Sequence, residues 1–242
     1  LPLTDNFEVN VAARYEDLDT ADSIDPKISL RWQVLDSLIL RASASTAFRE
    51  PSLSQFYAQE TSLQGLQDFN PDGSPKGGVV FVRVNSAGNL DLDPEESTNY
   101  NLGAIWEPSD NFDIRLDYWR FEYEDVITVE SAQGKLINDP NGEDILRVAG
   151  PDSQLAGVNA NYINAANVDT DGFDLTANWL IGSGRAGDFS MHLTGTHFLS
   201  YEIPDPSGGD RDVVGLFNHD NFARSIPETK ANLSFEWLSG NH

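Results

Sequence analysis

The chain has 242 residues, a formal net charge of −24 and no cysteine. This length fits one large all-β domain or two small ones, and the missing cysteines exclude disulfide frameworks, CxxC redox motifs and thiolate metal sites. The acidic balance argues against nucleic acid as a partner, because a phosphate-binding surface needs clustered Lys and Arg. The chain contains no run of about 18 apolar residues, so no transmembrane helix is predicted.

Period-two alternation of apolar and polar residues predicts eight strands. In chain order they cover residues 7–15, 27–34, 38–45, 99–106, 112–118, 173–179, 189–194 and 230–237. The seventh shows the weakest alternation. Each strand places apolar side chains on one face and polar side chains on the other, so together they fit a sheet with one apolar face.

The connections between these strands alternate between short and long. Short turns lie around Asp36-Ser37 and in residues 107–110, 182–187 and 239–241, and they are rich in turn-forming residues. The other connections run over residues 17–26, 49–94, 126–161 and 202–224, and all except the first are long and without predicted structure. Short turns at one rim and long loops at the other are typical of a transmembrane barrel.

Four of the five tryptophans lie one to three residues before a short turn, on every second predicted strand: Trp32, Trp106, Trp179 and Trp237. All four fall on apolar positions. Indole favours the interface between membrane and water, where its ring is buried and its N–H stays hydrated. The pattern predicts an aromatic girdle. Tryptophans that cap the core of a soluble sandwich are the alternative, but such a core does not require one depth on every second strand.

Five segments, in order along the chain, resemble the barrel of TonB-dependent receptors. They are residues 26–43, 46–53 (TAFREPSL), 90–103 (LDLDPEESTNYNLG), 112–127 (with DYWR at the centre) and 164–179 (with DGFDL). The fold class predicted is therefore all-β, an antiparallel up-and-down meander that forms part of a transmembrane β-barrel. The resemblance covers most of the chain outside the loops.

The resemblance implies a 22-stranded barrel in which these eight strands would be about strands 11 to 18. It also implies energised uptake of a bulky nutrient, such as an iron–siderophore complex, cobalamin or a glycan, across the outer membrane of a Gram-negative bacterium. The implied partners are outer-membrane lipid, the receptor's own plug domain, the TonB complex and the small-molecule nutrient. The family's plug, TonB box and last strands are absent, and Leu1-Pro2-Leu3-Thr4 has no initiator Met or signal sequence. We therefore expect residues 1–242 to form one partial barrel domain.

Two acidic clusters contain residue types that occur in functional sites, but they lack the residue pattern that such a site requires. The first loop lacks the glycine and final glutamate of a calcium-binding loop, and it contains Asp17, Asp19, Asp22 and Asp25. The second cluster could be compared with the paired carboxylates of a glycosidase, and it contains Asp91, Asp93, Glu95 and Glu96. Solvated rims are the commoner origin of such runs.

The histidines have no metal-ligand spacing: they are His192, His197, His219 and His242. We predict no catalytic residue, no cofactor and no metal site, and we do not expect an enzyme. One loop set mixes aromatic and hydrogen-bonding groups as ligand surfaces do, although ordinary packing at the barrel mouth explains it better: Arg49, Gln55, Phe56, Tyr57, Phe81 and Arg83.

Two other functions compete with a TonB-dependent receptor: a passive porin or structural barrel, and a soluble β-sandwich with a binding or hydrolytic role. The receptor hypothesis predicts that each strand pairs with its sequence neighbours, and that residues 7–15 and 231–237 are open edges. It places the four tryptophans on the convex apolar face, opposite Arg31, Asn101, Asn178 and Asn232. Because Trp119, Phe121 and Tyr123 reverse the apolar parity, a bulge or the end of the membrane zone is expected there.

Overall fold

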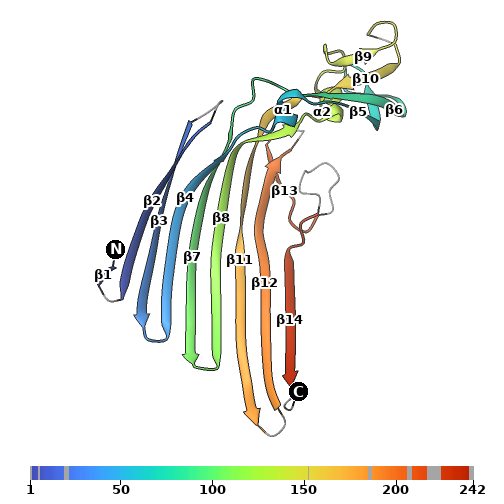
Figure 1. The fold of residues 1–242 in the computed structure, drawn as a ribbon. Helices are drawn as coiled ribbons and strands as arrows, with labels where there is room; N and C mark the ends of the chain where they lie inside the picture. The colour runs from blue at the N-terminus through green and yellow to red at the C-terminus, as the bar shows by residue number, and fades with distance from the viewer. Residues whose placement is uncertain are drawn as a thin grey trace.

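Eight long strands dominate the computed structural model, which describes residues 2–4, 6–18, 22–151, 153–184, 187–205, 209–216 and 225–239. They are β2 (Phe7–Asp17), β3 (Asp22–Leu35), β4 (Leu38–Arg49), β7 (Glu95–Ser109), β8 (Phe112–Val129), β11 (Tyr162–Gly184), β12 (Gly187–Pro204) and β14 (Thr229–Leu238). Each pairs antiparallel with the next long strand along the chain (Figure 1). The predicted up-and-down meander is confirmed.

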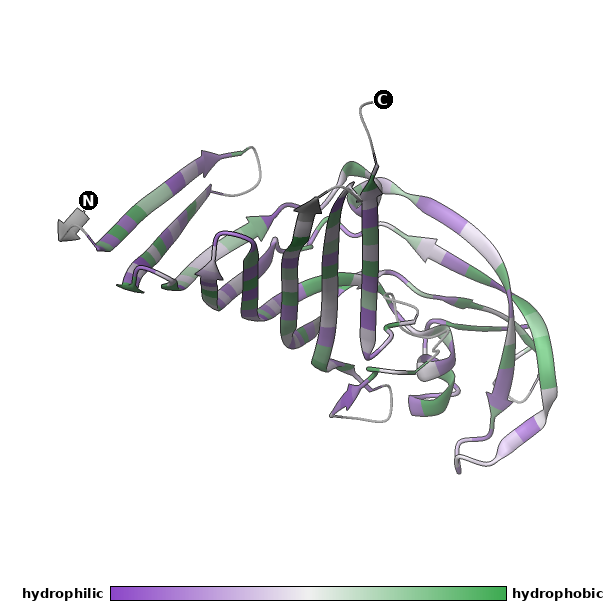
Figure 2. Cartoon of the chain, turned by 90° about the horizontal axis from the view of Figure 1, so that it is seen from below, coloured by the Kyte–Doolittle hydropathy of each residue, from purple (hydrophilic) through white to green (hydrophobic). Residues whose placement is uncertain are grey.

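The sheet is open in the described part of the chain. β2 and β14 are not paired with each other, and Figure 2 shows the strands bending into an arc whose two ends stay apart. Two short strands extend it: β1 (Pro2–Thr4) pairs with β2, and β13 (Asp210–Asp212) pairs with β12. The expectation of an open, curved sheet is confirmed.

The four tryptophans lie on one face of the sheet. In an antiparallel ladder, directly opposed residues share a face, as do residues two apart along a strand. The row that starts at Trp32 runs through Leu40, Ala104, Leu116, Leu175, Gly195 and Ala231. Trp106, Trp179 and Trp237 stand two, four and six residues from this row. The same ladder places Arg31, Asn101, Asn178 and Asn232 on the other face, as predicted.

These offsets also give the strand inclination that would bring the four tryptophans to one level. Trp106 lies two strands from Trp32, Trp179 four and Trp237 six, so the tryptophans advance one residue per strand. With a rise of about 3.3 Å per residue and about 4.8 Å between strands, they reach one level when the strands tilt by about 35°. Transmembrane barrels have strand tilts of about 35–45°. The sequence spacing of the tryptophans therefore matches the geometry of a tilted barrel wall.

The apolar face is not covered by other parts of the described chain. Trp32 is 47% exposed, Trp237 is 57% exposed, and Leu102, between the two ends of the face, is 58% exposed. Rings still contact along the row, with Phe112 6.4 Å from Trp106 and 6.5 Å from Trp179. A soluble sandwich would bury these side chains, so the exposed apolar face argues against that alternative.

The apolar face ends at Tyr118 and Phe173, whose rings lie 5.4 Å apart. The next outward residues are Arg120 and Asp171, which pair directly with each other. From Trp179 to Asp171 there are eight residues, which rise about 22 Å at this tilt, close to the apolar band of about 25 Å in outer-membrane barrels. The parity reversal is thus the end of the apolar zone. The ladder between β7 and β8 has no bulge at these residues.

The prediction of structureless connections at residues 49–94 and 126–161 is wrong. They contain α1 (Leu53–Tyr57), β5 (Gln59–Phe69), β6 (Pro75–Ala87), α2 (Ala132–Asn138), β9 (Ile145–Arg147) and β10 (Leu155–Asn159). Strands β5, β6, β10 and β9 make a second sheet, in which β6 and β10 pair in parallel. We call this second sheet with α2 the lobe, because Figure 1 shows it beyond one end of the main sheet. No described helix combines the length and apolar character needed to cross a membrane.

The lobe has its own apolar core. Leu136 of α2 and Val158 of β10 are fully buried, and Leu66, Val82 and Val84 pack with them. The turn at Asn70-Pro71-Asp72-Gly73, followed by a β-branched run, was a readable hairpin signal. The first connection is also shorter than predicted, since β2 continues to Asp17 and β3 starts at Asp22. Much of residues 202–224 lies outside the described residues.

Candidate functional site

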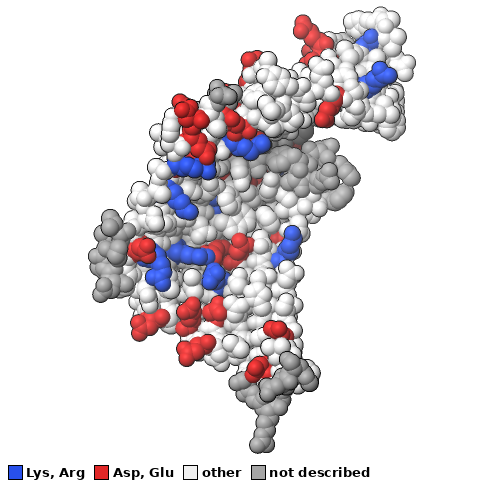
Figure 3. All heavy atoms as spheres, in the orientation of Figure 1, with Lys and Arg blue, Asp and Glu red and all other residues white. Residues whose placement is uncertain are grey.

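The polar face of the main sheet carries a row of eight residues, one from each long strand, of which six are charged; we call it the charge row. The row runs Glu8, Arg31, Arg41, Gly103, Asp117, Asp174, Thr196 and Lys230. Cations lie on β3 and β4, carboxylates on β8 and β11. Figure 3 shows blue and red atoms gathered across the middle of the sheet.

An ion pair crosses this row over a glycine. Arg41 on β4 donates from Nε to Asp117 Oδ1 on β8 at 2.9 Å, and its Nη2 donates to Oδ2. The strand between them, β7, presents Gly103, where a Cβ would stand 2.0 Å from Asp117 Oδ1 and 2.7 Å from Arg41 Nε. Only a residue without a side chain leaves room for this bidentate pair. Gly103 therefore serves the polar face.

Above the charge row, the polar face becomes aromatic. Trp119, Phe121 and Tyr123 follow one another on β8, with ring centroids 5.6 Å and 6.2 Å apart, the second pair stacked. Phe198 of β12 meets Trp119 edge-on at 5.3 Å. The two rings meet across Gly172 of β11, where a Cβ would lie 2.7 Å from the Trp119 ring. We call these four rings the aromatic ladder.

A bulge on β12 extends the ladder. Gly172 pairs with Phe198 but Asp171 pairs with Ser200, so Leu199 has no partner and the parity of β12 shifts. This shift keeps Tyr201 on the face of Phe198, near the apolar cluster that includes Val168 and Ile203. Together these rings make a partly exposed aromatic surface on the polar face of the sheet.

Two side chains tie the lobe's connections to the main sheet. Glu95 accepts hydrogen bonds from Arg49 Nε (2.6 Å) and from the backbone N–H of Ile127 (2.8 Å). Asn164 donates to the carbonyls of Asp93 (2.8 Å) and Asp125 (2.7 Å) and accepts from the Asp93 N–H. Asp125 adopts a φ of 54°, unusual for a residue with a side chain. These contacts fix where both loops leave the strands.

Inside the lobe, a buried ion pair joins the two loops. Arg147 of β9 donates to both carboxylate oxygens of Asp68 on β5 at 2.8 Å, and also to the carbonyls of Ser153 and Pro140 at 2.9 Å. The hydrogen bonds from Arg147 lower the pKa of Asp68 below its usual value, against the opposing effect of burial. Gln133 of α2 adds a reciprocal pair of hydrogen bonds to the backbone of Gln67.

We expect the lobe to loosen in acid. A carboxylate with a lowered folded pKa gives stability that is complete above the unfolded value near 3.9 and is lost as pH falls through the folded pKa. Hydrogen exchange of β5 and β9, corrected for intrinsic rates, should therefore show protection that is steady from pH 7 to about 4 and falls below that. Asp68→Asn should reduce protection at pH 7 and remove most of the acid dependence. Equal acid sensitivity in this variant would contradict the assignment.

Several of the acidic residues and histidines considered from the sequence make structural contacts in the described part of the chain. Glu95 and Asp93 belong to the connections just described, and Asp25 pairs with Arg14 at 3.4 Å; Asp19, His219 and His242 lie outside the described residues. His192 faces the polar side and meets the Asn178 side chain at 2.5 Å. No group of three or more potential metal ligands occurs in the described ranges.

The six loop residues that the sequence suggested as a ligand surface are divided among three elements. Arg49 pairs with Glu95 at the end of β4, Gln55 forms the capping box of α1 with Ser52, and Phe81 and Arg83 stand on β6. Phe56 and Tyr57 belong to α1 as well. The aromatic ladder was not considered as a site from the sequence. Its signal was present in the parity reversal at Trp119, Phe121 and Tyr123.

An open, antiparallel meander with one apolar face and one polar face is the architecture of part of a transmembrane β-barrel wall. The family model described as TonB dependent receptor-like, beta-barrel, matches residues 1–241. The chain belongs to the TonB-dependent receptor β-barrel family, whose members lie in the outer membrane of Gram-negative bacteria and act as transport receptors.

Proteins similar to this chain are consistent with this family assignment. The heme/hemopexin utilization protein C of Haemophilus influenzae (strain 86-028NP) is 27% identical over 183 residues, which cover 69% of this chain and 22% of that protein. A mutant of the ferric enterobactin receptor PfeA of Pseudomonas aeruginosa superposes with a TM-score of 0.67 at 18% identity, covering 99% of this chain and 29% of that one. The siderophore receptor PirA of Acinetobacter baumannii gives 0.63 at 16% identity, covering 98% and 29%. The chain thus spans less than a third of these relatives.

Proposed function

We propose that this chain is part of the barrel wall of a longer outer-membrane receptor that takes up an iron-bearing small compound, of the siderophore or heme class, with energy from the TonB complex. The match of the receptor barrel model to residues 1–241 carries the proposal. The similar proteins are named for heme utilization or as siderophore and ferric enterobactin receptors, which favours iron compounds over the cobalamin or glycan also considered.

The arrangement of the wall supports this function. The apolar face would meet lipid, the polar face would line the lumen, and the lobe would stand on the side of the long loops, outside the cell. A plug domain carried by the same polypeptide would occupy the lumen and meet the TonB complex. No observation specifically favours a passive porin.

The aromatic ladder is the ligand surface we propose. It lies on the lumenal face, between the charge row and the lobe, where a compound entering past the loops would meet it. Planar aromatic groups of a chelate or of heme would stack on Trp119, Phe121 and Tyr123.

Truncation of the ladder tests the assignment in the whole receptor. Trp119→Ala should weaken binding of the transported iron compound by about tenfold or more, because a central aromatic contact is lost. Trp106→Ala removes the same side chain from the opposite face and should leave affinity unchanged. Binding would be followed with heme and with ferric catecholate chelates, alongside growth of a receptor-deficient strain on each iron source. A receptor that supports growth on none of these iron sources would contradict the proposed function.

A further inference from the structure

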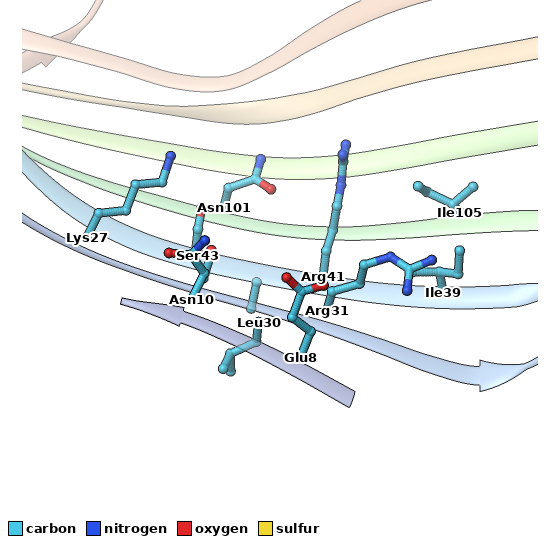
Figure 4. A pocket seen from close by; sticks show the side chains of 12 residues that line it. Glu8, Asn10, Lys27, Leu30, Arg31, Ile39, Arg41, Ser43, Asn101 and Ile105 are labelled. Atoms are coloured by element: carbon cyan, nitrogen blue, oxygen red, sulfur yellow. The ribbon is translucent and has the colours of Figure 1, made fainter. Parts of the chain in front are cut away.

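The polar face contains a hollow of about 570 Å³ over β2, β3, β4 and β7. Figure 4 shows Lys27 toward one end of it and Arg31 and Arg41 toward the other. Short polar side chains lie between them: Ser29, Ser43 and Asn101. The aromatic ladder does not line this hollow, so the hollow is a second feature of the lumenal face.

The cations of the hollow differ in their partners. Arg41 is committed to Asp117. Arg31 and Lys27 are exposed, and neither has an ion pair with any residue in the described ranges. The only carboxylate among the lining residues is Glu8, opposite Arg31 in the ladder. In a chain with 15 basic and 39 acidic residues, two such cations in one hollow leave an excess of positive charge.

The shape of the hollow favours a polypeptide over a small ligand. Small-ligand sites enclose most of the ligand and are largely apolar, whereas this one is a shallow stretch of strand surface. Its hydroxyl and amide groups both donate and accept hydrogen bonds, which matches the alternating groups of a peptide backbone. For charge complementarity, such a peptide would carry a carboxylate near Arg31 and another near Lys27.

We propose that this hollow seats an acidic polypeptide segment inside the barrel, with one Asp or Glu side chain held by Arg31 and another held by Lys27 toward the opposite end. The Arg41–Asp117 pair across Gly103 forms the fixed floor beside that seat. The inference rests on the proposed function, because it requires a barrel whose lumen holds further polypeptide of the same receptor. It assigns a sign of charge and a position to that contact.

Zero-length carbodiimide cross-linking of the whole purified receptor tests the proposal, because it joins a lysine amine to a carboxylate in salt-bridge contact. We expect Lys27 to form an amide with an Asp or Glu that lies outside residues 1–242, identified by mass spectrometry of peptides. Arg31→Lys keeps the charge and adds a second amine, which should join the same acidic peptide. Arg31→Gln with Lys27→Gln should release that peptide to faster hydrogen exchange by at least tenfold.

Lys230 is the matched control, because it is a cation of the same charge row on the distant strand β14. It should not join that peptide. If Lys27 reacts with a small amine-reactive reagent but forms no amide with a carboxylate outside residues 1–242, the proposal is wrong. It is also wrong if the double variant loses affinity for the iron compound while exchange is unchanged, since the hollow would then hold the ligand. If the receptor takes up the iron compound but Lys27 forms no such cross-link, this inference is refuted and the proposed function stays intact.

Discussion

Leu102→Arg is expected to destabilise the receptor in a bilayer by about 2–4 kcal/mol, because it places a cation on the lipid face near the middle of the apolar band. Leu102 lies four residues above Trp106 and two below Tyr100 on the apolar face, and it is 58% exposed. In a soluble protein, the same substitution at so exposed a position would change stability by less than about 0.5 kcal/mol. The size of the effect therefore distinguishes lipid from water at this face.

The control for Leu102→Arg is the neighbouring residue at almost the same depth. Asn101 points to the polar face, so Asn101→Arg should cost clearly less than Leu102→Arg, since its guanidinium meets the polar lumen rather than lipid. Folding titrations in denaturant with receptor reconstituted in lipid vesicles would measure both. Equal, small effects at the two positions would show that no membrane covers the apolar face.

Gly103→Ala is expected to destabilise the barrel by about 1–3 kcal/mol, through loss of a charge-assisted bidentate pair and displacement of its partly buried partners. The added methyl group would stand 2.0 Å from Asp117 Oδ1, so the carboxylate and the Arg41 guanidinium must separate. Arg41 retains contact with water at 38% side-chain exposure, which keeps the effect below the 3–5 kcal/mol of a fully buried pair.

A second strand glycine provides the control for Gly103→Ala. At Gly195 on β12, an added Cβ would meet its nearest atoms at 3.5 Å and 3.7 Å, which are ordinary contacts. Gly195→Ala should be neutral or slightly stabilising, because alanine has less backbone freedom to lose on folding. Midpoints of thermal unfolding of the whole receptor would compare the two. A Gly103→Ala midpoint equal to that of Gly195→Ala would exclude the strand-crossing ion pair.

The main sheet was predictable because its signals are local. Alternation assigned each strand's faces, and short turns assigned the neighbours, so the polar position of Arg31 and the apolar position of Trp179 both followed from the sequence. The tilt was also present in the spacing of the tryptophans, but it can be extracted only when the register of every ladder is known. One residue of slip in one ladder would reverse a face.

The lobe and the site depend on contacts between distant residues. The parallel pairing of β6 with β10 joins residues about 74 positions apart, as in Asn85 and Asn159, and no local pattern announces it. The role of Gly103 appears only when Arg41 and Asp117, 76 residues apart, are placed on either side of it. Phe198 of the aromatic ladder and the nearby Tyr201 share a face only through the bulge at Leu199, which the sequence does not mark.

We expect the two faces of this sheet to meet lipid and lumen, respectively. Single cysteines along residues 173–179 of β11 would test it most directly in the whole receptor, since this chain has no cysteine of its own. Nitroxide labels would report collisions with oxygen, which concentrates in lipid, and with a water-soluble nickel chelate. Strict alternation is expected, with labels at Phe173, Leu175 and Ala177 reached by oxygen and those at Asp174, Thr176 and Asn178 reached by the chelate or shielded by protein. Chelate access at every position, or oxygen access without alternation, would contradict it.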